Sequence, residues 1–363
     1  MRYSARSLES VAKLILLSFG CNQNEADTVA EHLIKANLAG HDSHGIGMLP
    51  TYGQQVEDGN LIPNQTPEYL PPAGAIRVVD ARRGFGHRMA ILALDHAIEA
   101  CSEHQVAVLG LRNSGHVSRA GHYSEYCAQR GLVSMHFVNV WGHPPLVAAH
   151  GSCQPGFSTN PISIGIPVDN KAKPMLDLAT STAAFGKVRV AYNRKEKIPT
   201  GWVIDDAGLS TNDPAPLVEE RSGALTPFGQ HKGSGLAIMV ELLAGAIAGK
   251  ETVATGNHIP RGVFNNMFSV LINPLAFDCQ EQMRARVTEF YTSIKGRCPV
   301  KGVSEVLMPG EPETRNAADR AINGIEVDSE TIDQLLETGH SFKLDGSRLR
   351  DMLEPVKLSD RYN

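Results

Sequence analysis

Apolar residues follow two different periods along the chain, and the change between them divides it. Near the N-terminus they recur every three or four positions, which predicts amphipathic helices. The expected helices are 8–19, 25–38 and about 46–58. Asn24, with Asp27 three residues later, is the expected N-terminal cap of the second helix. Glycines 20, 40 and 59 are the expected ends of the three.

Beyond about residue 76, short continuous apolar runs alternate with helical patterns, which is typical of an α/β protein. The expected strands are 106–111, 132–140, 162–168, 175–178, 265–273 and 304–308. The expected helices are 88–104, 119–130, 233–248, 315–323 and 329–337. We therefore expect a helical N-terminal region over 1–75, a central α/β domain over 76–225, a C-terminal α/β part over 226–340 that packs back on the first, and a tail over 341–363.

Composition and charge exclude several classes of partner. The 363 residues carry a net charge of −5 and the pI is about 6.3, so no basic field exists to attract nucleic acid or an anionic membrane. The most apolar stretch, 236–248, is shorter than the roughly 20 residues of a membrane helix. Six widely spaced cysteines without a C-x-x-C pair, and no recognisable secretory signal, favour the cytoplasm.

The common nucleotide-binding signatures are missing from the sequence. Residues 84–86 and 233–235 each supply G-x-G, but neither has a third glycine at the required offset. There is no G-x-x-x-x-G-K-[ST] phosphate loop and no G-x-S-x-G nucleophile elbow. A nucleotide, if bound, would have to be held by a fold other than the Rossmann fold.

Histidines supply the candidate chemistry. His44 stands beside Asp42 and Ser43 at an expected helix start, where the helix N-terminus lowers the imidazole pKa and a carboxylate raises it. A histidine balanced in this way can transfer a proton, although a surface histidine beside a capping Ser43 would have the same sequence. His116 follows a predicted strand, where ligand sites of α/β sheets gather, and a loop histidine bonded to backbone is its alternative.

Three further groups of residues invite a binding role. His136, His143 and His150 recur every seven residues, but no strong ligand pattern such as H-E-x-x-H occurs, so we expect no metal site. Lys232, before a helix of small residues, suits a phosphate or carboxylate, or is a solvated lysine. The segment 177–181, D-L-A-T-S, suits a ribose or a nicotinamide amide, or caps the next helix.

Six motifs in register resemble one family, the type 2 malate/L-lactate dehydrogenases, also called the sulfolactate dehydrogenase-like NAD(P)H oxidoreductases. The motifs are A-N-L-A-G-H-D-S-H-G at 36–45, R-N-S-G-H at 112–116, S-T-N-P at 158–161, D-L-A-T-S at 177–181, G-Q-H-K-G-S-G-L-A at 229–237 and L-M-P-G-E at 307–311. They occur in the order of the family from about residue 5 to 340, so the resemblance spans nearly the whole chain.

The resemblance implies a mixed-sheet α/β fold distinct from Rossmann, a homodimer, and a nicotinamide dinucleotide, NAD or NADP. It implies hydride transfer between NAD(P)H and a small 2-oxo acid, with His44 as proton donor and His116 in the same pocket. Our working hypothesis is that Ser43 or Asp42 orients His44. The implied cofactor contacts are His44, Ser118, Arg119, Ala120, Asp177, Leu178, Ala179, Thr180, Ser181, His231, Lys232, Asn265, Pro309, Gly310 and Glu311.

Two positions depart from the family pattern. Many relatives have a carboxylate-binding arginine where this chain has Met48, while the pocket residue Tyr52 is retained. Methionine cannot replace a charge-assisted arginine contact, so Arg119 or Lys232 is expected to take over, or the acid group lies differently. The sequence around Met48 resembles the hydroxycarboxylate dehydrogenase branch, which accepts bulkier 2-oxo acids. Ser158 replaces a usual glycine, which puts the shape of its loop in doubt.

Three other functions remain open from the sequence. The first is reduction of a cyclic imine carboxylate on the same fold. The second is a histidine-dependent metal hydrolase or lyase, which would lose activity to chelators. The third is a binding protein that holds a dinucleotide without turnover.

Overall fold

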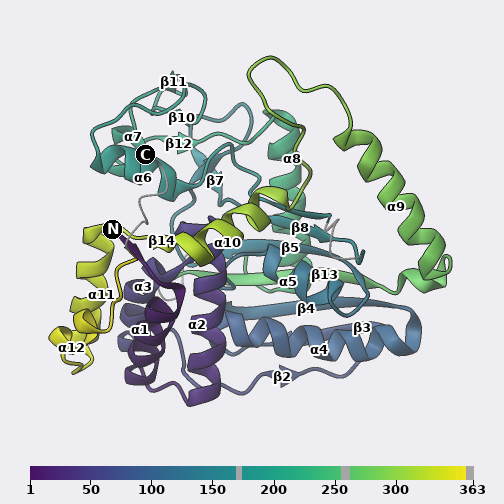
Figure 1. Cartoon of the computed structure of the whole chain (residues 1–363), viewed down its shortest axis with the longest axis horizontal. Coiled ribbons are helices and arrows are strands. Elements are labelled where there is room, and N and C mark those ends of the chain that lie inside the picture. The colour runs from purple at the N-terminus through teal and green to yellow at the C-terminus, as the bar shows by residue number, and fades with distance from the viewer. Residues whose placement is uncertain (169–173, 255–261, 357–363) are drawn as a thin grey trace.

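The computed structural model describes residues 1–168, 174–254 and 262–356. These residues form a helical layer, a large mixed sheet with its own helices, and a smaller lobe with a second sheet (Figure 1). Within these ranges, no helix combines the length and the apolar character that a membrane crossing requires.

The helical layer joins the two ends of the chain. Its helices are α1 (Ala5–Ser18), α2 (Gln23–Leu38), α3 (Leu49–Glu57), α11 (Ser329–Ser341) and α12 (Gly346–Asp351). Their apolar faces share one core, to which Leu8, Leu33 and Leu335 contribute. The strand β1 (Arg2–Tyr3) pairs antiparallel with β14 (Ile325–Glu326), so the C-terminal part packs back on the first helices.

The first two expected helices are confirmed, with two corrections in detail. The cap of α2 is Asn22, whose side-chain oxygen accepts the N–H of Glu25 at 2.9 Å, whereas Asn24 lies inside the first turn. The third helix starts later than expected, because residues Asp42–His44 and Ile46–Met48 form two 3₁₀ turns before α3. His44 therefore ends a 3₁₀ turn and does not begin an α-helix.

The large sheet is mixed, and its central strand comes from late in the chain. Its order is β2-β3-β4-β13-β5-β8-β9. The strands are β2 (Glu68–Tyr69), β3 (Ile76–Asp80), β4 (Val106–Gly115), β13 (Phe264–Ile272), β5 (Val133–Trp141), β8 (Ile162–Gly165) and β9 (Met175–Leu178). Among the described strands of this sheet, only β3 and β4 pair in parallel; β13 lies antiparallel between β4 and β5. Helices α4 (Gly86–His104) and α5 (Gly121–Ala128) share a buried core with this sheet.

Two strand expectations need correction. The strand over 106–111 continues to Gly115, where it still pairs with Phe264 of β13, so His116 directly follows the strand. The expected strand over 304–308 is absent from the described structure, and the segment is irregular. Its Glu305 pairs with Lys295 at 2.9 Å and with Arg315 at 2.5 Å, and no neighbouring strand meets its backbone.

The smaller lobe is built on a five-stranded sheet of order β11-β10-β12-β6-β7. Its elements are β6 (Val147–Ala148), β7 (Pro155–Phe157), α6 (Phe185–Asn193), β10 (Val203–Ile204), β11 (Ser210–Thr211), α7 (Ala215–Val218) and β12 (Ala224–Leu225). The expected helix 233–248 is observed as α8 (His231–Val240), which continues as a π-helix over Glu241–Ala248.

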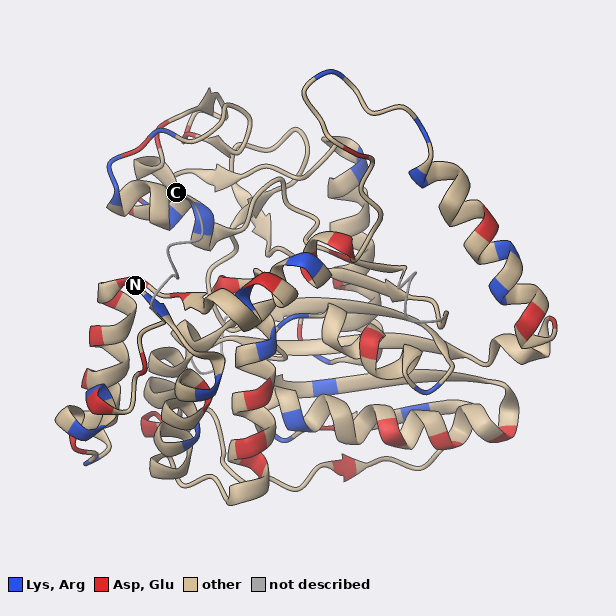
Figure 2. Ribbon diagram, in the orientation of Figure 1, with Lys and Arg blue, Asp and Glu red and all other residues tan. Residues whose placement is uncertain are grey.

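One long helix was not expected from the sequence. It is α9 (Gln280–Lys295), which stands beside the body of the protein (Figure 1) and has no buried residue in the described structure. Acidic and basic residues are mixed along it (Figure 2), so its apolar period is weak. Lys295, at its end, bonds to Glu311 of α10 (Glu311–Asn323) and so ties α9 to the body.

Candidate functional site

The turn that carries His44 is held by Asn37, near the end of α2. The Asn37 side chain is buried, donates from Nδ2 to Asp42 at 2.7 Å and accepts the N–H of Ile46 at 2.8 Å. A Cβ at Gly45 would lie 2.2 Å from Oδ1 of Asn37, so this position has room only for glycine. The S-H-G sequence therefore folds around a buried carboxamide.

Asp42 does not orient His44, contrary to one expectation from the sequence. Its carboxylate instead accepts two hydrogen bonds from the guanidinium of Arg320 in α10, at 2.6 and 3.0 Å. Ser43 is exposed, and a Cβ at Gly186 would lie 3.1 Å from its Cβ, which brings the start of α6 against the turn. The smaller lobe thus contacts the helical layer at the candidate site.

The partner of His44 is His116. Their nitrogens Nδ1 and Nε2 are 3.3 Å apart, and the two rings are nearly parallel, with planes inclined by 17°. The other nitrogen of His116, Nδ1, lies 2.7 Å from the hydroxyl of Tyr52. The structure thus joins a turn after α2, the end of β4 and α3 in one hydrogen-bonded group. It leaves Nε2 of His44 as the nitrogen that is not used in this group.

Both imidazoles are neutral over the physiological pH range. Burial, and then the charges of His41 and Arg119, lower the pKa of His44 to about 4. Burial, and then the neighbouring His44 and His87, lower the pKa of His116 well below its usual value. In a site with little water, each added positive charge costs more than it does in bulk solvent.

The loop after His116 is fastened to the rest of the site. Ser118, with a positive φ of 61°, donates from its hydroxyl to the carbonyl of His44 at 3.0 Å. The N–H of Val117 donates to Asn265 of β13 at 2.8 Å, and Asn265 in turn donates to the carbonyl of Asn139. Asn265 is thereby committed to positioning this loop, and Ala120 is buried within it.

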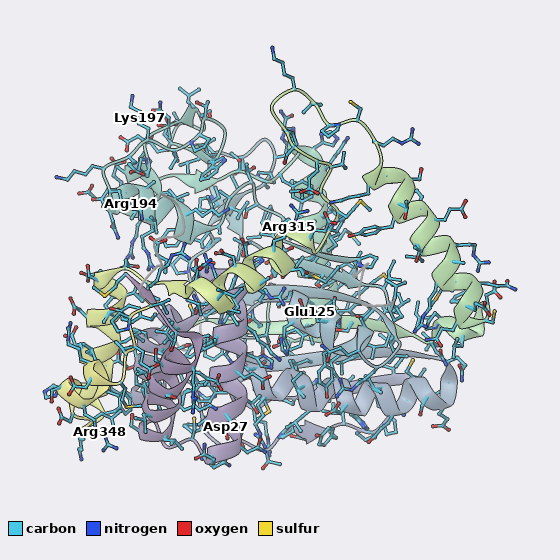
Figure 3. All side chains as sticks on the ribbon, in the orientation of Figure 1. Asp27, Glu125, Arg194, Lys197, Arg315 and Arg348 are labelled. Atoms are coloured by element: carbon cyan, nitrogen blue, oxygen red, sulfur yellow. The ribbon has the colours of Figure 1, made fainter. Side chains whose placement is uncertain are left out.

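Arg119 is a buried cation with unused hydrogen-bonding capacity. It pairs with Glu125 at 2.7 Å and lies 3.7 Å from Asp177, and only 4% of its surface is exposed. Its Nε and Nη1 atoms have no hydrogen-bond partner within the described structure. In the view of Figure 3, Glu125 lies near the middle, whereas Arg194 and Lys197 lie at the outer edge of the smaller lobe. A buried guanidinium with two free donors suits an anionic or carbonyl oxygen.

The segment 177–181 connects Arg119 to the smaller lobe. Asp177 accepts the N–H of Gly121 at 2.9 Å, and Leu178 ends β9. After Ala179, Thr180 bonds to the carbonyl of Thr159 through both its N–H and its hydroxyl and accepts the N–H of Phe228. Ser181 donates to Ala183. The segment therefore reaches the residues that precede α8.

The start of α8 presents a cation at a helix N-terminus. His231 and Lys232 are exposed, and the His231 ring lies 5.9 Å from that of His150. A Cβ at Gly233 would lie 2.2 Å from the carbonyl oxygen of Phe228, which explains the glycine after the lysine. The first N–H groups of a helix and a lysine together attract an anionic group.

The 309–311 turn reaches the same region from the other side. The N–H of Met175 in β9 donates to the carbonyl of Pro309 at 3.4 Å, and Gly310 begins α10 with a φ of 89°. Glu311 is held by Lys295 and by the N–H of Met308. Its carboxylate is therefore already engaged with the protein in this structure.

In the described structure, the histidines of the seven-residue spacing make separate contacts. His136 is inside β5, where its ring bonds to Ser134 and Ser269, and His143 bonds to the carbonyl of Pro144. Within the described ranges, no group of three or more histidine, cysteine or acidic side chains is arranged to hold a metal ion.

The sequence reasoning missed residues that stand behind the site. The ring of His87, the second residue of α4, is fully buried, and its Nε2 lies 3.5 Å from the Tyr52 hydroxyl. His32 and His122 lie beyond His87. A single histidine on the buried face of a helix is typical of an ordinary core position. The sequence therefore contains no motif that would have identified His87, His32 or His122.

The chain is similar in sequence and in structure to known dehydrogenases. Residues 3–336 match the family model for malate/L-lactate dehydrogenase. Hydroxycarboxylate dehydrogenase B of Escherichia coli is 38% identical over 90% of this chain and 91% of its own length. The solved sulfolactate dehydrogenase of Methanocaldococcus jannaschii superposes with a TM-score of 0.85 at 32% identity, covering 96% of this chain and 99% of that one. A Δ1-piperideine-2-carboxylate reductase from Pseudomonas syringae gives a TM-score of 0.78 at 28% identity, covering 93% of this chain and 99% of its own.

The Asn37–Gly45 contact leads to a prediction on stability. The φ and ψ of Gly45, −92° and −153°, are open to any residue, so only the contact with Asn37 opposes a side chain. Gly45→Ala should lower the free energy of unfolding by about 1–3 kcal/mol, measured by urea denaturation. Gly47→Ala is the matched control, because its Cβ would meet only Thr331, at 3.5 Å. Equal stability of the two variants would contradict this account of the turn.

Proposed function

The chain belongs to the malate/L-lactate dehydrogenase family, whose members are NAD(P)-dependent 2-hydroxy acid dehydrogenases, and we propose that it interconverts a small 2-oxo acid and its 2-hydroxy acid. The observation that carries this proposal is the His44–His116–Tyr52 group, which offers an oriented proton donor beside a buried arginine.

In the proposed reaction His44 is the acid/base. Its Nδ1 is occupied by His116, so its Nε2 is the atom that would protonate the substrate oxygen during reduction and accept that proton during oxidation. His116 and Tyr52 fix the plane of the ring, which removes the entropy of orienting the donor. Ser43 lies at the exposed side of the turn, where it would border the bound substrate.

Arg119 is the proposed partner of the substrate carboxylate. Two of its nitrogens are buried without a partner in the described structure. After burial and the charge of His41, the charge of Arg119 is the third cause that lowers the pKa of His44. Arg119 can therefore take the role of the carboxylate-binding arginine that many relatives have at the position of Met48. An incoming carboxylate would offset this positive charge and make His44 easier to protonate.

The residues on the other side of Arg119 fit a dinucleotide. Lys232 and the first N–H groups of α8 would hold a phosphate, with His231 beside them. Residues Thr180 and Ser181, the loop Ser118–Ala120 and the turn Pro309–Glu311 would line the remainder. The bound nicotinamide would supply the hydride. His44 and His116 would be neutral beside it, and Glu125 and Asp177 flank Arg119.

Met48 points to the kind of substrate. It is half-buried and packs against the apolar core of the helical layer, so this position supplies an apolar side chain and no cation. We propose a bulkier, apolar 2-oxo acid in preference to one with a second anionic group. Reduction of a cyclic imine carboxylate is the second candidate, supported by the likeness to the Δ1-piperideine-2-carboxylate reductase structure.

The exposed apolar side chains support a homodimer as the working form. Leu236, Ile238, Met239, Leu242 and Ile247 of α8 and its π-helical continuation are between 41% and 69% exposed. An apolar face of this kind marks an interaction surface, and a second copy can cover it with the same face by twofold symmetry. The helix α9 has no buried residue in the described structure, and its packing likewise calls for a partner.

A substrate panel tests the reaction. Reduced NAD and NADP would each be mixed with lactate-, malate- and aromatic-type 2-oxo acids and with a cyclic imine carboxylate, and nicotinamide absorbance followed. We expect turnover with an apolar 2-oxo acid and a higher kcat/KM than for dianionic ones. Turnover of the imine alone would select the second candidate, and turnover of none would overturn the proposal.

His44→Ala tests the acid/base role. Loss of a positioned proton donor should lower kcat by about 10²–10⁴-fold, while the dissociation constant of NAD(P)H, measured by fluorescence, changes little. The control is His96→Ala, because His96 lies on α4 beside Glu99 and Tyr69, away from the His44–His116 pair. Turnover like that of the unmodified protein in the His44 variant would remove His44 from the mechanism.

Leu242→Asp tests the dimer surface. A charge in the middle of the apolar face should convert the dimer to a monomer of 39.2 kDa in size-exclusion chromatography with light scattering. Leu209→Asp is the matched control, since Leu209 is also exposed but belongs to the smaller lobe. If Leu242→Asp keeps the mass of the control, the dimer does not use this face.

A further inference from the structure

Behind the candidate site, six aromatic side chains follow one another through the interior, and we call them the histidine row. Its members, in spatial order, are His44, His116, Tyr52, His87, His32 and His122. They come from six different segments: the 3₁₀ turn, the end of β4, α3, α4, α2 and α5. The row starts at the proposed acid/base and ends at a residue that is partly exposed.

The first half of the row is joined by polar contacts. Nδ1 of His44 lies 3.3 Å from Nε2 of His116, whose Nδ1 lies 2.7 Å from the Tyr52 hydroxyl. The same hydroxyl lies 3.5 Å from Nε2 of His87. Tyr52 therefore stands between two imidazoles and can accept from one while it donates to the other.

The second half of the row consists of adjacent rings with free nitrogens. The rings of His87 and His32 meet edge to face at 5.6 Å between centroids, and those of His32 and His122 are 3.7 Å apart. The Nδ1 atoms of all three are buried and have no hydrogen-bond partner in the described structure. Buried polar atoms without partners are uncommon, so three in adjacent rings call for an explanation.

After His44 has given a proton to the substrate, it must receive another proton, and the row could supply it. A neutral imidazole that gives up its Nε2 proton must take another at Nδ1, or it becomes an anion. The atom that faces Nδ1 is a nitrogen of His116, and substrate would occupy the Nε2 side. The pKa of His44 is lowered to about 4, so a proton stored on the ring beforehand is not available at neutral pH.

We propose that the histidine row supplies the proton that His44 delivers to the substrate, with His122 as the entry from solvent. The row has this task only if the chain reduces a 2-oxo acid, so the inference rests on the proposed function. His87, His32 and His122 do not touch the substrate; they act on it through His44 and are positioning residues in this sense.

One proton crosses the row for each 2-oxo acid reduced. His44 gives its Nε2 proton to the substrate oxygen and takes one at Nδ1 from Nε2 of His116. His116 takes the hydroxyl proton of Tyr52, and the Tyr52 oxygen takes the Nε2 proton of His87. His87 then takes a proton at Nδ1 from a ring nitrogen of His32, His32 takes one from a ring nitrogen of His122, and His122 takes one from water. Because the Nδ1 atoms of these three rings have no hydrogen-bond partner in the described structure, a ring must turn before each transfer between them.

No member of the row holds a charge while the enzyme rests. Burial lowers the pKa of His32, His87 and His122, and the charges of Lys35 and Arg119 lower those of His32 and His122 further. Burial likewise raises the pKa of Tyr52, so its hydroxyl must receive one proton as it passes the other on. Transfer from His87 to His44 is then a concerted shift between neutral tautomers along the four groups that polar contacts connect. His32 and His122 restore the proton of His87 between turnovers, after their rings have turned.

The test measures hydride and proton transfer separately. In the oxidation direction, with weak buffer and a pH indicator, nicotinamide absorbance reports the hydride and the indicator reports the proton reaching solvent. In the unmodified enzyme the two signals should rise together. In His122→Gln and His87→Gln the proton signal should lag by at least about tenfold, because positioned proton transfer is lost. Added imidazole should remove the lag in His122→Gln, since it can replace the side chain at the partly exposed entry.

The control is His136→Gln, which changes another buried histidine of low pKa, bonded to Ser134 and Ser269 outside the row. A purely structural role would slow both signals together, in the row variants as in the control. The proposal is overturned if proton release keeps pace with hydride transfer in both row variants, or if imidazole leaves the lag in His122→Gln unchanged. If no 2-hydroxy acid changes the nicotinamide absorbance at all, the proposed function fails before the row is tested.

Discussion

The arrangement of the site depends on one buried carboxamide, that of Asn37. It receives the N–H of Ile46 and donates to Asp42, and it fills the space beside Gly45 in which any side chain would collide. Because α2 ends here, the chain must turn, and these contacts decide the direction. The turn then projects His44 out of the helical layer and toward the end of β4. Arg320 of α10 holds the same turn from outside by binding Asp42.

Charge in the site is balanced in two ways: the buried arginine is paired with carboxylates, and the histidines are neutral. Arg119 is the buried cation, and Glu125 and Asp177 flank it. Burial, the charge of His41 and then the charge of Arg119 lower the pKa of His44, so that ring stays unprotonated. A substrate carboxylate at Arg119 would weaken the effect of the arginine charge, so substrate binding and readiness for proton transfer would be coupled. A neutral imidazole with its Nδ1 on His116 is suited to transferring a proton and less suited to storing one.

Several segments contribute to the site because β13 enters the sheet between β4 and β5. Its Asn265 holds the loop that carries Ser118 and Arg119, and this contact joins positions 148 residues apart in the chain. The segment from Asp177 to Ser181 then connects Arg119 to the start of α8 through Thr180 and Phe228. The proposed substrate side and the proposed cofactor side of the site are thus linked by direct contacts through Arg119 and Asp177.

The sequence by itself determined the local elements and the identity of the chemical groups. Apolar periodicity located α1, α2, α4, β5 and β9 within a few residues, because burial of one face sets that period in the chain itself. Ordered motifs selected His44, His116 and the 177–181 segment as candidates. Helix α9 was not predicted, since a helix without buried residues has no strong apolar period. The strand expected at 304–308 is absent from the described residues, where no neighbouring strand pairs with it.

Only the tertiary structure decided which of these groups meet. The partner of His44 is His116 and not Asp42, and His87, His32 and His122 stand behind them, from elements that no local signal connects. The reason is physical: periodicity and capping are properties of neighbours in sequence, whereas pKa values and hydrogen-bond partners at a buried site depend on neighbours in space. The order of β13 in the sheet and the crossing of the helices over it fix those neighbours.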